Sequence, residues 1–267
     1  MKKFGFTLAE VLITLAIIGV VAAMTIPTLV QNYKQKQMIV ALQKSYALFK
    51  NVFELSKVDH GDFSSWQWTH IDYESRTQHF WETYLLPYLK VAKTCFPISE
   101  DCYPYTEARM LNGVNNLHTV TNDGIVVLND GTTIWSWSSN DLYNPHIRIN
   151  IDINGSKAPN VVGKDIFYFF FTTSPAQVSI GSVNENEEYL ASNSFKYVYG
   201  FSIFGEGSGM TVEEALDPNV KFRQELDISS VEDFACYDGT QRGNWGILCG
   251  YAIKQNGWKI PDGYPKL

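Results

Sequence analysis

The feature that most constrains this chain is an apolar segment at its N-terminus. The 25 residues 6–30 carry a single formal charge, on Glu10, and follow a short leader with two lysines. As an α-helix rising about 1.5 Å per residue, this segment is long enough to cross a hydrocarbon core about 30 Å thick. No comparable run occurs elsewhere in the 267 residues. The sequence therefore predicts one membrane-spanning helix at one end of the chain.

The charges beside this segment and the cysteines indicate the side on which the body of the chain lies. Two lysines precede the segment, and Lys34 and Lys36 follow it closely. The positive-inside rule therefore gives only a weak preference for a cytoplasmic N-terminus. All four cysteines lie beyond residue 94, and disulfides persist outside the cytoplasm. We expect an extracytoplasmic body.

The net charge of −7 is distributed unevenly along the chain. Residues 1–50 contain six lysines and one acid, whereas the remainder has 15 basic and 27 acidic residues. Binding to nucleic acid requires a basic patch that neutralises phosphates. The acidic body argues against such a surface, and no nucleic-acid partner is expected for it.

Glu10 is an anomaly within the apolar segment. A carboxylate deep in such a helix costs about 2.5–3.5 kcal/mol on insertion scales and needs a partner. No Lys, Arg or His lies within residues 6–30. The partner is then another chain, a free amine or a proton. The simpler alternative is a neutral glutamate tolerated near the membrane interface.

The N-terminal pattern resembles the type IV prepilin signature. Its parts are a short basic leader, the run Gly-Phe-Thr-Leu-x-Glu at residues 5–10, and the apolar helix behind it. In that family a membrane peptidase cleaves after the glycine and methylates the new N-terminal phenylalanine. The resemblance implies that Gly5 ends the leader, that Phe6 becomes the methylated N-terminus, and that Glu10 pairs with the N-terminal amine of a neighbouring subunit during assembly. It also implies that Pro27 is the proline at which the family's helix can kink or melt.

Two other interpretations of the N-terminus remain open. A secretory signal peptide would use the small residues 21–23 as its cleavage site, and an uncleaved signal anchor would keep the whole segment. The apolar region is well above the usual length of 7–15 residues, which disfavours a signal peptide. Neither interpretation explains Glu10.

A helical pattern continues beyond the apolar segment. Large apolar residues recur at steps of three and four, with lysines and glutamines between them, at Ile39, Leu42, Tyr46, Phe49 and Phe53. This stripe predicts an amphipathic helix that packs on a sheet and stops at residues 60–62. A coiled coil or a membrane-surface helix fits the same stripe.

The middle of the chain predicts an antiparallel sheet. Residues 62–118 indicate a loop-rich region with short helices, for example at 77–89, and strand signals begin near residue 119. Two Asn-Asp-Gly turns and the patterns around them predict a hairpin, then a half-buried strand, then a strand buried on both faces. These strands are expected at 125–128, 132–137, 146–153 and 165–171.

The fold class that follows is α+β, with a long N-terminal transmembrane and amphipathic helix packed on an antiparallel β-sheet head, as in pilins. We expect three parts: a prepilin leader at residues 1–5, the long helix at 6–60 with its transmembrane part at 6–30, and an extracytoplasmic globular head at 61–267.

The four cysteines predict two structural disulfides. Four cysteines allow three pairings, and proximity favours Cys95 with Cys102 and Cys236 with Cys249. The spacings are too long for C-x-x-C redox chemistry, and no second paired motif indicates zinc. The C-terminal pair resembles the disulfide-bounded region that staples the heads of many type IV pilins.

The segment 152–165 is a candidate calcium loop. Oxygen-bearing side chains, which hard cations prefer, alternate with glycine and proline in it, at Asp152, Asn154, Asn160 and Asp165. The spacing departs from that of an EF-hand, because the glycine is fourth and no glutamate closes the loop. A similar run occurs in many bacterial pilin-like proteins. The alternative is an Asx-capped turn that links two strands. In that case the protein binds no cofactor.

No catalytic constellation emerges from the sequence, and we expect no enzyme. The histidines lack metal-binding spacing, and no H-E-x-x-H occurs. The glycine-rich run at residues 205–209 has neither the lysine of a P-loop nor the G-x-S-x-G elbow of a hydrolase.

The resemblance implies a structural subunit, a minor pilin or pseudopilin, of a type IV pilus-like or type II secretion filament. Its expected partners are other pilin or pseudopilin subunits, a prepilin peptidase, the inner-membrane assembly machinery and membrane lipid. Its expected location is the bacterial cytoplasmic (inner) membrane, which it spans once, and then the filament. Two alternatives stay open. One is a tip-located binding module for adhesion or DNA uptake, and the other is a signal-anchored extracytoplasmic protein without a filament role.

Overall fold

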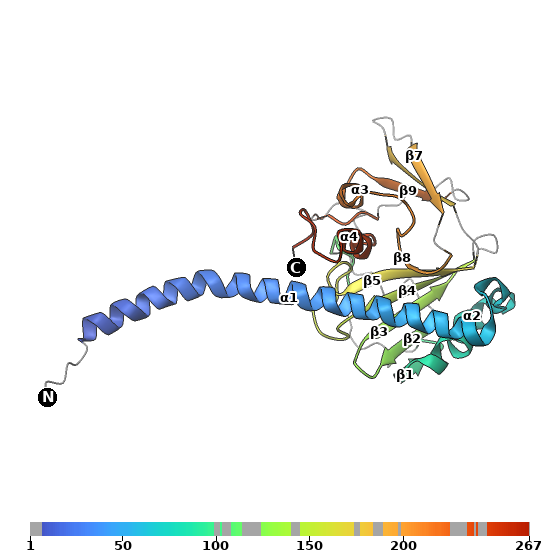
Figure 1. Ribbon diagram of the computed structural model, residues 1–267, viewed down its shortest axis with the longest axis horizontal. Helices are drawn as coiled ribbons and strands as arrows, with labels where there is room; N and C mark the ends of the chain where they lie inside the picture. The colour runs from blue at the N-terminus through green and yellow to red at the C-terminus, as the bar shows by residue number, and fades with distance from the viewer. Residues whose placement is uncertain are drawn as a thin grey trace.

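A long helix and a β-sheet head make up the part of the chain that the computed structural model describes, which is residues 7–98, 102, 108–113, 124–139, 145–173, 177–183, 189–196, 199–224, 234–237, 239 and 245–266. Helix α1 (Leu8–His60) projects from the head, and its second half lies across the sheet (Figure 1). It is the one helix of the described residues that is long and apolar enough to cross a membrane.

Helix α1 has two halves with different surroundings. At about 1.5 Å per residue its 53 residues extend about 80 Å. The window that is apolar enough to span a membrane has no residue buried by the head. In the second half one face is buried, at Met38, Leu42, Ser45, Phe49, Val52, Phe53 and Ser56. The helix ends where predicted, because Gly61 adopts a φ of 79°, which glycine tolerates at little cost.

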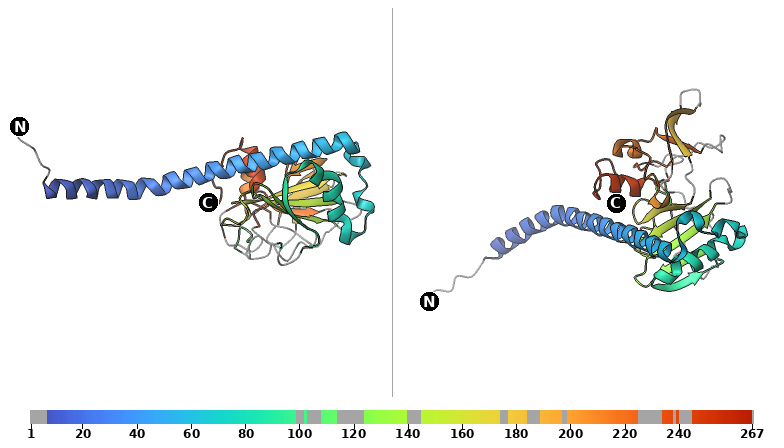
Figure 2. Two further views of the ribbon diagram at one scale, coloured as in Figure 1. Left: turned by 90° about the horizontal axis from the view of Figure 1, so that it is seen from below. Right: turned by 45° about the vertical axis from the view of Figure 1, so that its right-hand side comes forward.

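A six-stranded antiparallel sheet forms the core of the head, in the order β1-β2-β3-β4-β5-β8. The second half of α1 crosses one of its faces (Figure 2). Its strands are β1 (Val91–Cys95), β2 (Gly124–Leu128), β3 (Thr133–Ser138), β4 (His146–Asp152), β5 (Ile166–Thr172) and β8 (Gly200–Ile203). The α+β architecture and the helix-on-sheet packing are confirmed.

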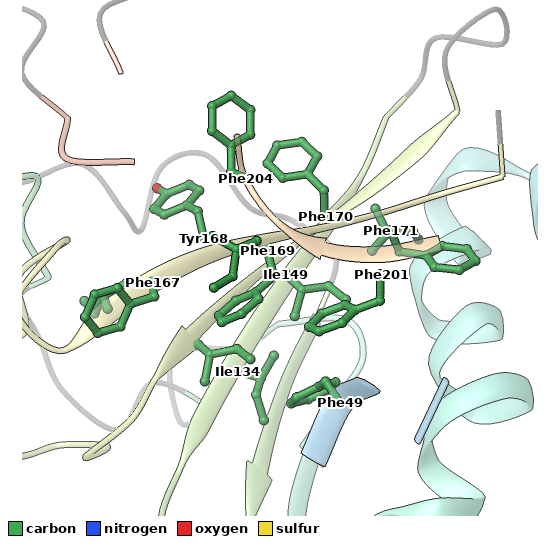
Figure 3. Packing of buried hydrophobic residues seen from close by; sticks show 14 of the residues in the cluster. Phe49, Ile134, Ile149, Phe167, Tyr168, Phe169, Phe170, Phe171, Phe201 and Phe204 are labelled. Atoms are coloured by element: carbon green, nitrogen blue, oxygen red, sulfur yellow. The ribbon is translucent and has the colours of Figure 1, made fainter. Parts of the chain in front are cut away.

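Aromatic rings hold α1 on the sheet. The ring of Phe53 stacks on Phe171 of β5 at 4.8 Å and on Phe201 of β8 at 5.0 Å between centroids. Phe49 stacks on Phe201 at 5.6 Å (Figure 3). Each fully buried Phe contributes about 1.5–3 kcal/mol through burial of apolar surface. The predicted stripe therefore attaches the head to the long helix.

Shorter elements surround this core. Between α1 and β1 lie the turns η1 (Phe63–Ser65) and η2 (Trp68–His70), helix α2 (Tyr73–Phe80), the π-helical turn η3 (Trp81–Leu85) and η4 (Leu86–Tyr88). A second antiparallel sheet, in the order β7-β6-β9, contains β6 (Gln177–Val183), β7 (Tyr189–Lys196) and β9 (Lys221–Gln224). Two further helices are α3 (Val212–Leu216) and α4 (Cys249–Gln255).

Parts of the head differ from the sequence-based expectation. β1 lies in the region predicted to be loops, because most of this edge strand is exposed and lacks an alternating pattern. β4 is not half-buried: the sheet face away from α1 is also covered, and its polar residues Asn150 and Asp152 are buried as well. The second sheet and α4 were not predicted. The strand signals expected from near residue 119 begin outside the described residues, which resume at residue 124.

Candidate functional site

The N-terminus of α1 forms a reciprocal cap around Glu10. The backbone N–H and the hydroxyl of Thr7 each donate to Oε2 of Glu10 at 2.8 Å. In return, the backbone N–H of Glu10 donates to Oγ1 of Thr7 at 3.3 Å. This capping box satisfies N–H groups that have no partner inside the helix. The carboxylate of Glu10 is thereby held at the N-terminal end of α1, beside the N-cap residue Thr7.

Thr7 is a partner for Glu10 that the sequence interpretation missed. That interpretation considered only another chain, a free amine or a proton. The signal was present in the sequence, since Thr-x-x-Glu before an apolar run is a capping-box pattern. Gly5 and Phe6, the residues implied for cleavage and methylation, lie outside the described residues.

Two threonines in the apolar half of α1 donate hydrogen bonds to carbonyls of the helix itself. The hydroxyl of Thr14 donates to the carbonyl of Glu10 at 3.0 Å, and that of Thr25 donates to the carbonyl of Val21 at 2.9 Å. Such bonds lower the cost of placing a hydroxyl in lipid. The helix continues through Pro27 without interruption, so the subunit alone shows no melting there.

A polar cluster ties α1 to the C-terminal part of the head. The ammonium of Lys254 on α4 lies 2.6 Å from Oε1 of Glu206, which also accepts from the hydroxyl of Tyr46 at 3.3 Å. Burial alone would lower the pKa of Lys254, but Glu206 and Tyr46 outweigh it and raise that pKa. The raised pKa of Lys254 stabilises the folded protein at every pH below 10.5, the ordinary pKa of lysine. This stabilisation is lost only as the pH rises through the folded-state pKa.

Both disulfides that proximity favours are present. Cys95 is bonded to Cys102, and Cys236 to Cys249. The second pair is fully buried and abuts Gly163, whose φ is 81°. A Cβ at Gly163 would lie 2.5 Å from Sγ of Cys249, so only glycine fits there. The C-terminal disulfide is thus packed directly against the loop at residues 152–165.

Asp165 organises that loop through donors of the loop itself. Its carboxylate accepts the backbone N–H of Asn160 at 2.8 Å and that of Val161 at 2.7 Å, and the side-chain amide of Asn154 at 3.3 Å. Asp152 accepts the backbone N–H of Asn154 at 3.1 Å, which is an Asx turn. Burial raises the pKa of Asp165, against the opposing effect of these hydrogen bonds.

Hydrogen bonds connect the four residues considered for calcium, but Asn160 reaches Asp165, and Asn154 reaches Asp152, through backbone N–H groups rather than side chains. Two of the four are amides, and the carboxylate of Asp165 is engaged by three N–H donors. Among the residues that the structure describes, no group of three or more His, Cys, Asp or Glu side chains is placed to hold a metal ion.

We predict that Asp165→Asn destabilises the folded protein by about 1–3 kcal/mol at pH 7, because at least one half-buried backbone N–H loses its acceptor. The folded-state pKa of Asp165 is raised, so the wild type gains stability from this group as the pH falls from above that pKa to 3.8. The difference between variant and wild type is therefore expected to widen on acidification in this window. Thermal unfolding of the full chain in detergent across pH measures both effects.

The matched control for this prediction is Asp217→Asn. Asp217 accepts the backbone N–H of Asn219 at 2.8 Å in an exposed turn, a role that asparagine also fills. We expect a change within about 0.5 kcal/mol for this variant. Equal unfolding temperatures for the two variants at pH 7 would show that Asp165 does not organise its loop.

Comparison with protein-family models finds two matches. Residues 1–26 match the prokaryotic N-terminal methylation motif, which is the prepilin signature of type IV pilins and pseudopilins. Residues 28–267 match a family of unknown function (DUF6613). Comparisons with the curated proteins and with the solved structures give no match.

These matches set the class of the protein. The methylation motif supports a filament subunit like a type IV pilin or pseudopilin, and implies processing by a prepilin peptidase and assembly with other pilins. With the apolar helix, it indicates that the subunit is anchored in a membrane. Since the second match covers the chain from residue 28 to its end, the protein belongs to the family of unknown function DUF6613 and carries a prepilin-type N-terminus.

Proposed function

We propose that this chain is a structural subunit of a type IV pilus-like or type II secretion filament. The observation that carries the proposal is the apolar half of α1, which the head leaves uncovered. Exposure of such an apolar surface to water is unfavourable, so lipid covers it before assembly and neighbouring helices cover it afterwards. The role is mechanical rather than enzymatic.

The proposal assigns a task to each part of the chain. Residues 1–5 are the leader, residues 6–60 are the anchor and later the filament core, and residues 61–267 are the extracytoplasmic head. The subunit spans the inner membrane once before the assembly machinery extracts it. Glu10 then exchanges its contact with Thr7 for the N-terminal amine of a neighbour.

A second candidate is a minor subunit at the filament tip whose head binds a surface, a glycan or DNA. The second sheet favours it, because this sheet lies away from α1 in Figure 1 and is not needed to cover the helix. The abundance of the chain in sheared filaments separates the two candidates. Bulk amounts favour the main structural subunit, and trace amounts favour the tip subunit.

The test of the proposal is intact and N-terminal mass spectrometry of the protein purified from its native membrane. We expect the mature chain to begin with N-methylated Phe6. A chain that begins at Met24 would instead be a secreted protein released by signal peptidase. An intact Met1 would leave a simple membrane anchor, and either result would overturn the filament proposal.

A further inference from the structure

An arginine in the middle of β4 lies among aromatic rings on the face of the main sheet away from α1. The guanidinium of Arg148 is 5.3 Å from the ring centroid of Trp137 on β3, 5.6 Å from that of Phe170 and 5.9 Å from that of Tyr168, both on β5. Figure 3 shows Tyr168 and Phe170 on the side of β5 opposite to Phe169, whose ring stacks on α1. Ion pairs between described residues are all formed by lysines, and none involves Arg148.

The rings attract this cation but do not satisfy its hydrogen-bond donors. A guanidinium has five N–H donors in its plane, which need oxygen acceptors. Within the described part of the chain, Nε of Arg148 is buried and has no such acceptor. Arg76 on α2 shows the usual solution, because its nitrogens donate to the carbonyls of Thr69, Ile71 and Ser139. Arg148 is therefore a cation for which the described residues supply rings but no anion.

This arginine lies at an accessible margin of the sheet. Arg148 and Trp137 are both half-buried, whereas Trp135, two residues earlier on β3, is 6% exposed and belongs to the core. The indole N–H of Trp137 donates to the hydroxyl of Tyr73 at 2.9 Å, which holds the indole ring in place. Tyr73 begins α2, and Figure 1 shows α2 at the end of the head far from the N-terminus. A ligand outside the membrane can therefore reach this margin.

The chemistry of these side chains indicates the class of ligand. A guanidinium binds a carboxylate through two parallel hydrogen bonds, and Trp137 offers an apolar ring surface beside it. Two residues along the same face of β4, Oδ1 of Asn150 is a buried acceptor without a partner among the described residues. A hydroxyl can satisfy it directly or through a water.

An acidic sugar is the ligand that combines these features. It carries a carboxylate, a face of C–H groups that covers an aromatic ring, and several hydroxyl donors. An inorganic anion lacks the apolar face, and an acidic peptide presents its carboxylates on flexible side chains that lose entropy on binding. The body of the chain has 27 acidic and 15 basic residues, so general charge attraction would not hold an anion here. Binding must depend on the specific site.

We propose that Arg148, Trp137 and Asn150 bind an acidic sugar, such as a uronic acid unit of a polysaccharide. Arg148 takes the carboxylate, Trp137 the face of the sugar ring and Asn150 a hydroxyl. The inference rests on the second candidate for the proposed function, a tip subunit that binds an external ligand, and adds the site and the class of that ligand.

The test is isothermal titration calorimetry of the full chain in detergent with a short oligogalacturonide. We expect the wild type to bind it at least about tenfold more tightly than its methyl-esterified form, which keeps the rings and most hydroxyls but lacks the charge. Arg148→Gln should weaken binding about tenfold or more, because the charged fork is lost. The matched control is Arg109→Gln, which makes the same charge change at an exposed residue and should alter affinity less than twofold.

The unfolding temperature of each variant shows whether it is folded. If Arg148→Gln does not fold, Arg148→Lys replaces it, since lysine keeps the charge but cannot bind a carboxylate through a planar fork. Trp137→Phe, which keeps a smaller ring, should weaken binding about threefold.

Several outcomes would overturn the proposal. They are no binding of the oligogalacturonide, equal affinity for its esterified form, or equal losses in Arg148→Gln and Arg109→Gln. Tighter binding of oligoglutamate than of oligogalacturonide would assign the site to an acidic peptide instead. Because the titration uses the purified chain, it does not require a filament. Failure to bind by a chain that begins with methylated Phe6 would overturn the sugar site alone, whereas an unmethylated N-terminus would overturn the filament function alone.

Discussion

Replacement of Glu10 by leucine is expected to abolish incorporation into filaments while cleavage after Gly5 and membrane insertion continue. Leucine removes the carboxylate that we propose to pair with the neighbour's amine, and leaves that amine without a counter-charge in an apolar core. Removing one partner of a buried ion pair costs about 3–5 kcal/mol, which corresponds to more than about 100-fold in an assembly equilibrium. The ratio of sheared filament to membrane-bound subunit, measured by immunoblot, tests this result.

Two further variants separate the charge of Glu10 from its role in the cap. Glu10→Gln keeps an acceptor for Thr7, since glutamine also completes a capping box, but removes the charge. Thr7→Val removes the hydroxyl and leaves the carboxylate. We expect Glu10→Gln to fail nearly as completely as leucine, and Thr7→Val to lose only a few-fold in assembly. Wild-type assembly by Glu10→Leu, or full recovery with glutamine, would contradict the electrostatic account.

The long helix and the main sheet follow from periodic patterns, and both were predictable. The stripe through Leu42, Phe49 and Phe53 has helical spacing and lies on the sheet. The run of phenylalanines in β5 is buried on both faces, as its composition indicates. These elements were predictable because the apolar residues that they bury form a recognisable pattern within each segment.

Elements that tertiary contacts stabilise were not predictable in the same way. β1 pairs with β2 at the edge of the sheet, with most of its side chains exposed, so its sequence shows no buried face. Helix α4 begins at Cys249 and is buried around Ala252 and Ile253. A pattern of seven residues is too short to distinguish a helix from a strand. The helical conformation of α4 depends instead on its packing against α3 and β5.

The two parts of the candidate site were predictable to different degrees. Glu10 was evident from its sequence alone, because a lone carboxylate in an apolar helix is costly. The donors of Asp165 were not, since two of the three are backbone N–H groups that only the folded loop brings within reach. Sequence shows the side chains that a loop offers, whereas its backbone donors depend on the conformation.

Removal of the C-terminal disulfide by Cys236→Ser/Cys249→Ser is expected to lower the unfolding temperature of the full chain by about 6–12 °C. The bond closes a loop with a sequence separation of 13 residues, which the chain-entropy model equates with about 3 kcal/mol. Each kcal/mol shifts the melting temperature of a domain of this size by about 2–4 °C. Both cysteines are fully buried. The serine hydroxyls that replace them would therefore be buried, which is costly where they lack hydrogen-bond partners.

The matched control is Cys95→Ser/Cys102→Ser, which opens a loop with a separation of seven residues, worth about 2.4 kcal/mol. Cys95 ends the exposed edge strand β1, and both cysteines of that pair are 7% exposed, whereas Cys236 and Cys249 are 0% exposed, so the C-terminal pair is the more deeply packed. The C-terminal pair abuts Gly163, whose carbonyl accepts the hydroxyl of the buried Tyr264. Its loss should therefore also loosen the last residues, which trypsin would detect as faster cleavage at the exposed Lys259. If the losses of stability differ by no more than the difference in loop closure, about 0.6 kcal/mol, and cleavage at Lys259 is unchanged, the two disulfides act only by closing loops and the contact with Gly163 adds nothing.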